Sequence, residues 1–346
     1  MEAILFGNGF NLLSGNCPSW QSLLNEISAN RLVPKLKDIV PNTYTYENIF
    51  LSPVLEATIE NSKEEENLKN KVKNLLANLI PTETYKDLLD LEADCYLTTN
   101  YDNTIFNNKK KFIKAWDRSE NLYSIRRWRQ IETNDHNFLL FQIHGDVDNV
   151  KSIMLGLDHY TGSLAKVQDY VKGIYQREPK DKKKEAVAKS KGTKGDYFKY
   201  YKVPPLIKRL NGSIVLQKPE KYGFENNGTG LLSWIDAFFF SNLHIIGFNL
   251  DFSEVDIWWL LVRRARLMKD SYTNQFMSNK IYYYPVNPTE EELKKEKSKI
   301  NFLKTLGVEI CLPDYDLLQD PTYNEVYSLQ IQNIRDRMIQ AQTAIF

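Results

Sequence analysis

A short apolar run near the N-terminus, ending in a glycine-rich turn, is the feature that constrains the fold most. Ala3–Phe6 is apolar, and the turn at 7–11 reads Gly-Asn-Gly-Phe-Asn. Pro18 follows, and apolar residues then recur at helical spacing at Trp20, Leu23, Leu24 and Ile27. A strand, a glycine-rich turn and a helix in this order open nucleotide-binding α/β folds, although an ordinary tight turn has the same composition.

Further apolar runs alternate with helical patterns along the chain. The expected strands are residues 95–98, 138–143, 152–155, 243–247, 281–284 and 308–311. Helices are expected over most of 44–91, over 255–267 and from about 323 onward. This alternation predicts an α/β fold, with a Rossmann-like, mostly parallel sheet, helical insertions and a C-terminal helix. Ligands of such sheets bind at the carboxyl ends of the strands.

Composition limits the partners and the metal content. The 346 residues hold 45 Lys and Arg against 44 Asp and Glu, which argues against a globally basic nucleic-acid coat protein. Three cysteines lie far apart, at Cys17, Cys95 and Cys311, so we expect no zinc ribbon, no metal and no disulfide framework. We also expect a cytoplasmic protein without a membrane partner, because neither a signal peptide nor a membrane-spanning stretch is evident.

The segment 177–202 departs from the charge balance. It holds ten basic and four acidic residues, a net charge of +6. We interpret it as a solvated loop that lies outside the catalytic pocket, and binding of nucleic acid to it stays open.

Polar side chains follow the expected strand at 95–98, in the sequence Thr98-Thr99-Asn100-Tyr101-Asp102-Asn103. An asparagine at the end of a strand can orient a water molecule or ribose hydroxyls, and an aspartate can accept hydrogen bonds from an amide or a sugar. The alternative is that Asn100 or Asp102 only caps a helix.

His144 ends the apolar run at 138–143 and precedes Gly145. A histidine there can act as a general base near neutral pH, whereas a purely structural histidine is the alternative. Because parallel strands end at one edge of a sheet, we expect Asn100 and His144 to meet there. We expect neither to contribute much to stability. Asp146 and the nearby Asp148 fit a solvated turn.

Two further segments follow late strands. One is Gly247-Phe248-Asn249-Leu250, and the other contains Asn287. Ser253 and Asp256 form a loose capping box before the helix at 255–267. No Walker phosphate loop, HExxH or GxSxG motif is present.

Taken together, these motifs come in one order: Gly7-x-Gly9 with Gly15 and Pro18, Thr99-Asn100-x-Asp102, His144-Gly145, Gly247-x-Asn249-Leu250, and Asn287. This order resembles the sirtuin-like superfamily, and most closely its bacterial antiphage-defence branch. The resemblance covers most of residues 1–312. The opening turn is also similar to that of AbiH-type abortive-infection proteins.

The resemblance implies roles for particular residues. The catalytic set would be Asn100, which positions ribose and water, Asp102 on the nicotinamide side, and His144, which handles a ribose hydroxyl proton. The NAD-binding set would be Gly7, Asn8, Gly9, Asn11 and Thr99, with Gly247, Asn249 and Asn287 at the adenosine half.

This chain also departs from the family pattern. Asn249 stands where serine is usual, with Asp251 and Asp256 beyond it, and Asn11 replaces the serine of many relatives. The four-cysteine zinc module of deacylase sirtuins cannot form from three cysteines.

The resemblance implies an NAD⁺ glycohydrolase that uses NAD⁺ as substrate and acts in antiphage defence by NAD⁺ depletion and abortive infection. We expect a homo-oligomer held in an off state until a phage component or a partner ATPase releases it. Two alternatives stay open: an NAD-dependent deacylase or ADP-ribosyltransferase, and a non-enzymatic nucleotide-binding or scaffold subunit. We expect one NAD-binding domain over 1–312, with a helical and basic insert at 161–235, and a helical extension over 313–346.

Overall fold

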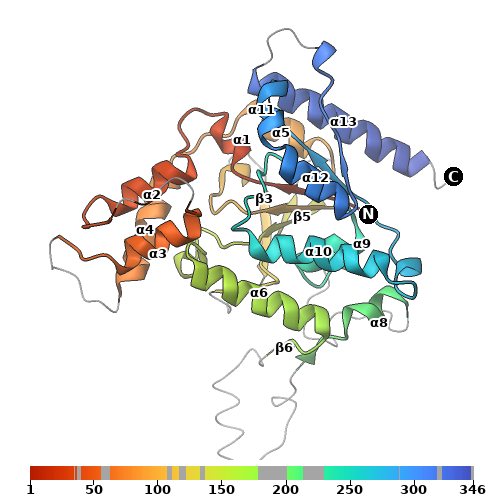
Figure 1. Ribbon diagram of the computed structural model, residues 1–346, viewed down its shortest axis with the longest axis horizontal. Helices are drawn as coiled ribbons and strands as arrows, with labels where there is room; N and C mark the ends of the chain where they lie inside the picture. The colour runs from red at the N-terminus through yellow and green to blue at the C-terminus, as the bar shows by residue number, and fades with distance from the viewer. Residues whose placement is uncertain are drawn as a thin grey trace, which may run out of the picture.

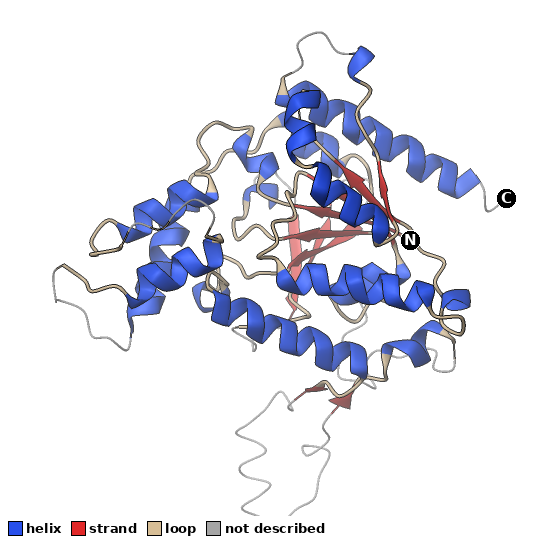
Figure 2. Ribbon diagram, in the orientation of Figure 1, coloured by secondary structure: helices blue, strands red, loops and turns tan. Residues whose placement is uncertain are grey.

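The computed structural model describes residues 1–34, 36, 40–55, 63–106, 111–116, 122–132, 137–177, 201–212, 230–287, 289–317 and 322–343. A sheet forms its centre (Figure 2). It has eight strands, in the order β10-β9-β8-β1-β2-β5-β4-β3. The strands are β1 (Glu2–Phe6), β2 (Cys95–Thr98), β3 (Lys111–Trp116), β4 (Trp128–Glu132), β5 (Asn137–Gln142), β8 (Asn242–Ile246), β9 (Ile281–Tyr284) and β10 (Val308–Ile310). The strands from β10 to β5 are parallel, whereas β4 and β3 run antiparallel at one edge.

Helices cover both faces of the sheet (Figure 1). One face packs against α6 (Leu157–Lys172), α8 (Leu206–Leu210), α9 (Ala237–Phe240), α10 (Val255–Lys269) and α12 (Lys297–Thr305). The other packs against α1 (Gly9–Leu12), α5 (Glu83–Leu89) and α13 (Tyr323–Thr343). Burial on both faces explains why the parallel strands are apolar throughout instead of alternating with polar residues.

A helical lobe projects from the carboxyl edge of the sheet and has its own apolar core. It consists of α2 (Trp20–Ser28), α3 (Asn42–Leu51) and α4 (Glu64–Leu76). The lobe is tied to α6 by a hydrogen bond between Nε2 of His159 and Glu65, at 2.7 Å. The His159 Nδ1 atom accepts hydrogen bonds from the backbone N–H groups of Leu155 and Gly156. The ring proton is therefore on Nε2, which donates a hydrogen bond to Glu65.

The remaining elements are short. They are the helix α11 (Glu290–Lys295), the antiparallel pair β6 (Gln176–Arg177) and β7 (Tyr201–Lys202), and 3₁₀ turns at Thr104–Phe106, Val150–Ser152, Trp234–Asp236, Asn274–Phe276 and Tyr315–Leu317. Most of the basic segment falls at 178–200, outside the described residues. No described helix has the length and apolar character needed to cross a membrane.

The fold class predicted from the sequence is confirmed, and one expected strand is wrong. Residues 152–155 do not join the sheet, because the Met154 N–H donates to the His144 carbonyl at 2.9 Å while Ile153 and Leu155 pack into the core of the helical lobe. The antiparallel strands β3 and β4 were not predicted.

The division into a domain, an insert and an extension stays a prediction. Within the expected insert, the α6 residues Val167 and Tyr170 pack in the same core as the sheet. Within the expected extension, Ile331 and Ile334 of α13 pack on the opposite face of the sheet.

Candidate active site

A pocket of about 850 Å³ lies at the carboxyl ends of the central parallel strands. The loops after β1, β2, β5, β8 and β9 form its base, and residues of the helical lobe and of α13 form its walls. This size falls within the usual range of ligand pockets, about 300–1,000 Å³. The sequence argument that ligands bind at this edge of the sheet therefore leads to a real cavity.

The pocket brings together most of the site residues predicted from the sequence. Those that line it are Asn8, Gly9, Thr99, Asn100, Asp102, His144, Gly247, Asn249 and Asn287. Gly7 and Asn11 do not line it. Asn11 is buried outside the pocket, and its side chain hydrogen-bonds those of Asn8, Tyr85 and Asp102.

Asn100 is held by its amide group. Its Nδ2 donates to the Gly7 carbonyl at 3.2 Å and to the Tyr85 hydroxyl at 3.4 Å. Its own N–H donates to the Thr98 hydroxyl at 3.1 Å. The side-chain carbonyl of Asn100 has no hydrogen-bond partner among the described residues and is therefore the acceptor that Asn100 offers to a ligand.

Asp102 and Asn11 link two loops. One Asp102 oxygen accepts from Asn11 Nδ2 at 2.7 Å, and the other caps the 3₁₀ turn at Thr104 at 2.9 Å. Asn11 also donates to Asn8 Oδ1 and accepts from the Tyr85 hydroxyl. The capping alternative thus holds for Asp102, and Asn11 acts in this structure as a buried brace for the glycine turn.

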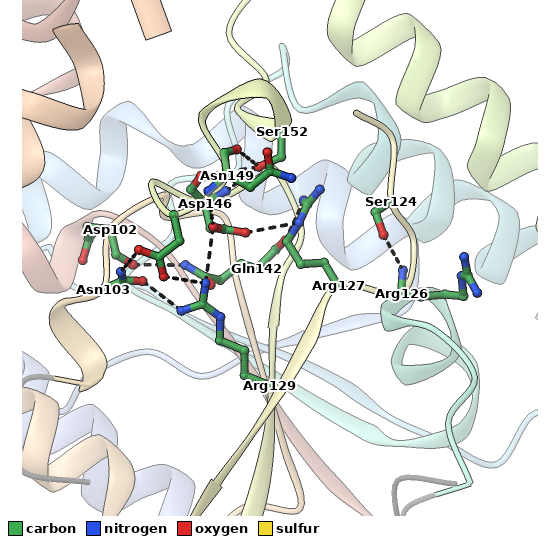
Figure 3. Close-up of polar contacts among 11 residues, drawn as sticks. Asp102, Asn103, Ser124, Arg126, Arg127, Arg129, Gln142, Asp146, Asn149 and Ser152 are labelled. Carbon is green, nitrogen blue, oxygen red and sulfur yellow. Dashed lines mark hydrogen bonds and ion pairs between the residues drawn. The ribbon is translucent and has the colours of Figure 1, made fainter. Parts of the chain in front are cut away.

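A second polar network supports the loops from beneath (Figure 3). The carboxylate of Asp146 lies 3.3 Å from Arg127 Nε and 3.3 Å from Arg129 Nη2. Arg129 also reaches Asp148 at 2.9 Å and Asn103 at 3.2 Å. Asp146 is buried and paired, so the expectation of a solvated turn is wrong for it, while the side chain of Asp148 is 54% exposed.

His144 is buried between two carboxylates that the sequence analysis did not assign to the site. Its Nε2 lies 3.3 Å from Asp256, and its Nδ1 lies 3.4 Å from Glu254. The Tyr160 hydroxyl lies 3.5 Å from Nδ1. Asp256 also accepts the Ser163 hydroxyl at 2.9 Å.

The expected capping box at Ser253 and Asp256 does not form. Helix α10 begins at Val255 with Glu254 at the N-cap, and no side chain caps it. Asp256 is instead fully buried against His144. A carboxylate three residues after a serine has the same sequence signature in both roles, so only its tertiary partner distinguishes them.

The charges around His144 favour an imidazolium. Burial alone would lower the pKa of His144, but the charges of Asp256 and Glu254 and the hydrogen bond to Asp256 together raise it. Burial by itself would raise the pKa of Asp256. The charge of His144 and the hydrogen bonds to the carboxylate outweigh burial, so the pKa of Asp256 is lowered. Burial raises the pKa of Glu254 to about 7. Of the two acids, Glu254 lines the pocket, so it is the acid that a ligand meets.

His144, Glu254 and Asp256 also form the one described group of three side chains whose donor atoms come close enough for a metal ion, within 4.8 Å of one another. However, the two carboxylates face different ring nitrogens of His144. This is the geometry of a bridged imidazole and not of three donors that converge on one ion.

The glycines of the opening turn are required by close packing against the Gly247 turn. The Gly9 N–H donates to the Gly247 carbonyl at 3.0 Å, so it is already occupied. A Cβ atom at Gly7 would lie 2.8 Å from the Phe248 ring. Gly247 itself has a φ of +61°, which favours glycine. On the far side of the pocket, Lys299 Nζ binds both oxygens of Asn249 at 2.6 Å.

Comparison with known families gives a match to part of the chain. Residues 94–188 match a family described as a SIR2-like domain. The match includes Asn100, Asp102 and His144, whereas Gly7–Asn11, Gly247–Asp256 and α13 lie outside it. A comparison with curated proteins finds none that matches this chain.

Proposed function

We propose that this chain is an NAD⁺ glycohydrolase that releases nicotinamide and ADP-ribose. The observation that carries the proposal is the meeting of Asn100 and His144 in one pocket, at the ends of the adjacent parallel strands β2 and β5, inside the SIR2-like match. A family of this kind is compatible with the use of NAD⁺.

The charge of the pocket fits the cationic nicotinamide ring of intact NAD⁺. Four acidic residues line it, and one of them, Glu254, contacts His144; the others are Asp102, Asp251 and Glu296. The nicotinamide ring of NAD⁺ is positive before the glycosidic bond breaks, and positive charge moves to the ribose as it breaks. Carboxylates fixed at this place stabilise the oxocarbenium-like transition state.

The chemistry needs one water molecule. The C1′–N bond of NAD⁺ breaks, nicotinamide leaves as a neutral ring, and water oxygen forms the new bond to C1′. We assign the free side-chain carbonyl of Asn100 to the orientation of that water or of the ribose hydroxyls.

The proton that water loses goes to Glu254 in this proposal. The hydrogen bond from Nε2 to Asp256 and the charge of Glu254 beside Nδ1 favour a protonated His144, and an imidazolium has no lone pair with which to act as a base. Glu254 lines the pocket and has a pKa near neutrality. His144 then holds Glu254 in place and stabilises its carboxylate, and Asp256 fixes the ring.

The test is the incubation of purified protein with NAD⁺, with nicotinamide and ADP-ribose measured by chromatography. Stoichiometric release of both products, abolished in Asn100→Ala, supports the proposal. Release of nicotinamide only in the presence of an acyl-lysine peptide identifies a deacylase instead. No turnover under any condition, with NAD⁺ still bound, identifies a nucleotide-binding subunit.

We also propose the cellular role, which is NAD⁺ depletion during phage infection. A constitutive activity of this kind would harm its own cell, so the enzyme is held inactive until assembly, a partner ATPase or a phage component releases it. Expression of the wild-type chain and of Asn100→Ala in phage-challenged cells, with NAD⁺ measured after infection, tests this role.

A further inference from the structure

The C-terminal helix α13 contributes directly to the pocket, although it lies far outside the SIR2-like match at 94–188. It runs along the α5 side of the sheet (Figure 1). Its register is fixed by Gln330, which is fully buried and donates to the carbonyls of Pro285 at 2.8 Å and Cys311 at 2.9 Å. One turn before Gln330, this anchoring places Tyr327 in the pocket wall.

Tyr327 inserts its hydroxyl between the two glycine turns. A Cβ atom at Gly9 would lie 2.1 Å from this hydroxyl, and a Cβ atom at Gly247 would lie 2.8 Å from it. The Tyr327 ring packs edge-on against Phe10, with a centroid distance of 4.8 Å. The absence of side chains at Gly9 and Gly247 is therefore what admits the Tyr327 hydroxyl to this position.

The Tyr327 hydroxyl has no hydrogen-bond partner among the described residues, although the residue is only 2% exposed. A hydroxyl that lines a pocket and has no protein partner is available to hydrogen-bond a ligand atom. Burial raises the pKa of Tyr327, so the hydroxyl is protonated and can donate.

The first turn of α13 offers further hydrogen-bond donors beside Tyr327. The 21-residue helix α13 begins at the pocket, where Tyr323 and Asn324 line it, so the positive end of the helix faces the cavity. The Glu325 carboxylate accepts from the N–H and hydroxyl of Thr322, which leaves the next two N–H groups of the first turn without a partner among the described residues.

No charged donor in the described lining of the pocket could bind a phosphate oxygen in place of Tyr327. Among the described residues that line the pocket there is no lysine or arginine, while Asp251, Glu254 and Glu296 are acidic. The Gly9 N–H is already bonded to Gly247. A phosphate oxygen at this place must therefore be held by neutral donors.

We infer that Tyr327 donates a hydrogen bond to the diphosphate of the bound dinucleotide, so that the C-terminal helix completes the ligand site. The inference rests on the proposed function for the identity of the dinucleotide. It makes Tyr327 a binding residue for the phosphates, at a distance from the atoms that react.

The test compares Tyr327→Phe with the wild type by isothermal titration calorimetry, using ADP-ribose, ADP and adenosine as ligands. We expect Tyr327→Phe to weaken the binding of ADP-ribose and ADP by about tenfold or more, the usual effect of losing a hydrogen bond to a charged oxygen. Adenosine, which has no phosphate, should behave identically toward both proteins. The exposed Tyr272, which does not line the pocket, gives the matched control Tyr272→Phe, with unchanged binding of all three ligands.

Wild-type affinity for ADP-ribose and ADP in Tyr327→Phe overturns the inference, and so does an equal loss of adenosine binding, which indicates a structural effect. Failure of the wild type to bind either diphosphate also overturns it. Release of nicotinamide by the wild type is measured separately. Tyr327-dependent binding of ADP-ribose without nicotinamide release supports the diphosphate site and contradicts the glycohydrolase proposal. Nicotinamide release by the wild type, together with ADP-ribose binding that does not depend on Tyr327, supports the glycohydrolase proposal and contradicts the diphosphate site.

Discussion

The Nε2 atom of His144 lies 3.3 Å from a carboxylate oxygen of Asp256, although 112 residues separate them in the chain. This contact joins the loop after β5 to the first turn of α10. It also gives the ring a fixed orientation, because the opposite nitrogen faces Glu254. The position of His144 in the pocket therefore depends on two acids that lie outside the SIR2-like match.

Replacement of Asp256 should destabilise the protein. Asp256→Asn removes the charge opposite a buried imidazolium, and breaking a buried pair in this way costs about 3–5 kcal/mol. We expect a comparable loss in the free energy of unfolding, measured by chemical denaturation at pH 7. Asp158→Asn, at an exposed position in the first turn of α6, is the control and should cost about 1 kcal/mol or less. Equal stability of the two variants would contradict the buried ion pair.

Glu254 should set the pH dependence of NAD⁺ hydrolysis. His144, Asp256, Asp251 and the Tyr160 hydroxyl act on this carboxyl group, and burial raises its pKa to about 7. A base must be deprotonated, so the rate should rise with pH through about 7 and then level off. In Glu254→Gln the rate should fall by about 100-fold and the inflection should disappear.

The measurement is the initial rate of nicotinamide release between pH 5.5 and 9. The control is Glu309→Gln, because the side chain of Glu309 is 47% exposed and pairs with Arg337 away from the pocket. This control should keep the wild-type profile. A Glu254→Gln enzyme that retains the inflection near pH 7 would return the role of base to His144.

Asn100 should matter more for chemistry than for stability. Asn100→Ala removes the free carbonyl that we assign to water or ribose, and we expect a loss of about 100-fold or more in turnover. It also removes the hydrogen bonds to Gly7 and Tyr85, which should lower the free energy of unfolding by about 1–2 kcal/mol. Asn25→Ala, at an exposed position of α2, is the control for both measurements.

His144 differs from Asn100 in this respect, because its burial and its pairing argue against the sequence-based expectation that its removal would leave stability unchanged. The ring is 1% exposed and paired with two acids. His144→Ala would leave Asp256 buried without its counterion, so loss of activity in that variant must be separated from loss of fold.

The sheet could be predicted from the sequence because its parallel strands are buried on both faces and are therefore apolar throughout. Strand β4 escaped prediction because it reads Trp-Arg-Gln-Ile-Glu, a mixed polar pattern. Arg129 within it is buried only because Asp146 lies opposite, a pairing that the sequence order does not reveal. Glu254 and Asp256 escaped for the same reason, since acids at a helix start ordinarily indicate capping.

Metal removal should leave the protein folded and active. His144 presents its two nitrogens to different carboxylates, so the three side chains do not converge on one ion. We expect chelator-treated protein to retain its unfolding temperature and its nicotinamide release. Elemental analysis that finds one tightly bound zinc per chain, lost together with activity, would contradict this.

Asp146 and Asp148 offer a direct comparison of a buried and an exposed carboxylate on the same arginine, Arg129. Asp146→Ala removes the buried carboxylate that Arg127 and Arg129 share. Removing one partner of a buried ion pair should lower the free energy of unfolding by about 3–5 kcal/mol. Asp148→Ala removes an exposed partner and should cost about 1 kcal/mol or less. Because Asp146 lies two residues after His144, its loss should also lower nicotinamide release in whatever fraction remains folded. Chemical denaturation of both variants gives the free energies, and a cost for Asp148→Ala equal to that for Asp146→Ala would show that burial does not govern the strength of this network.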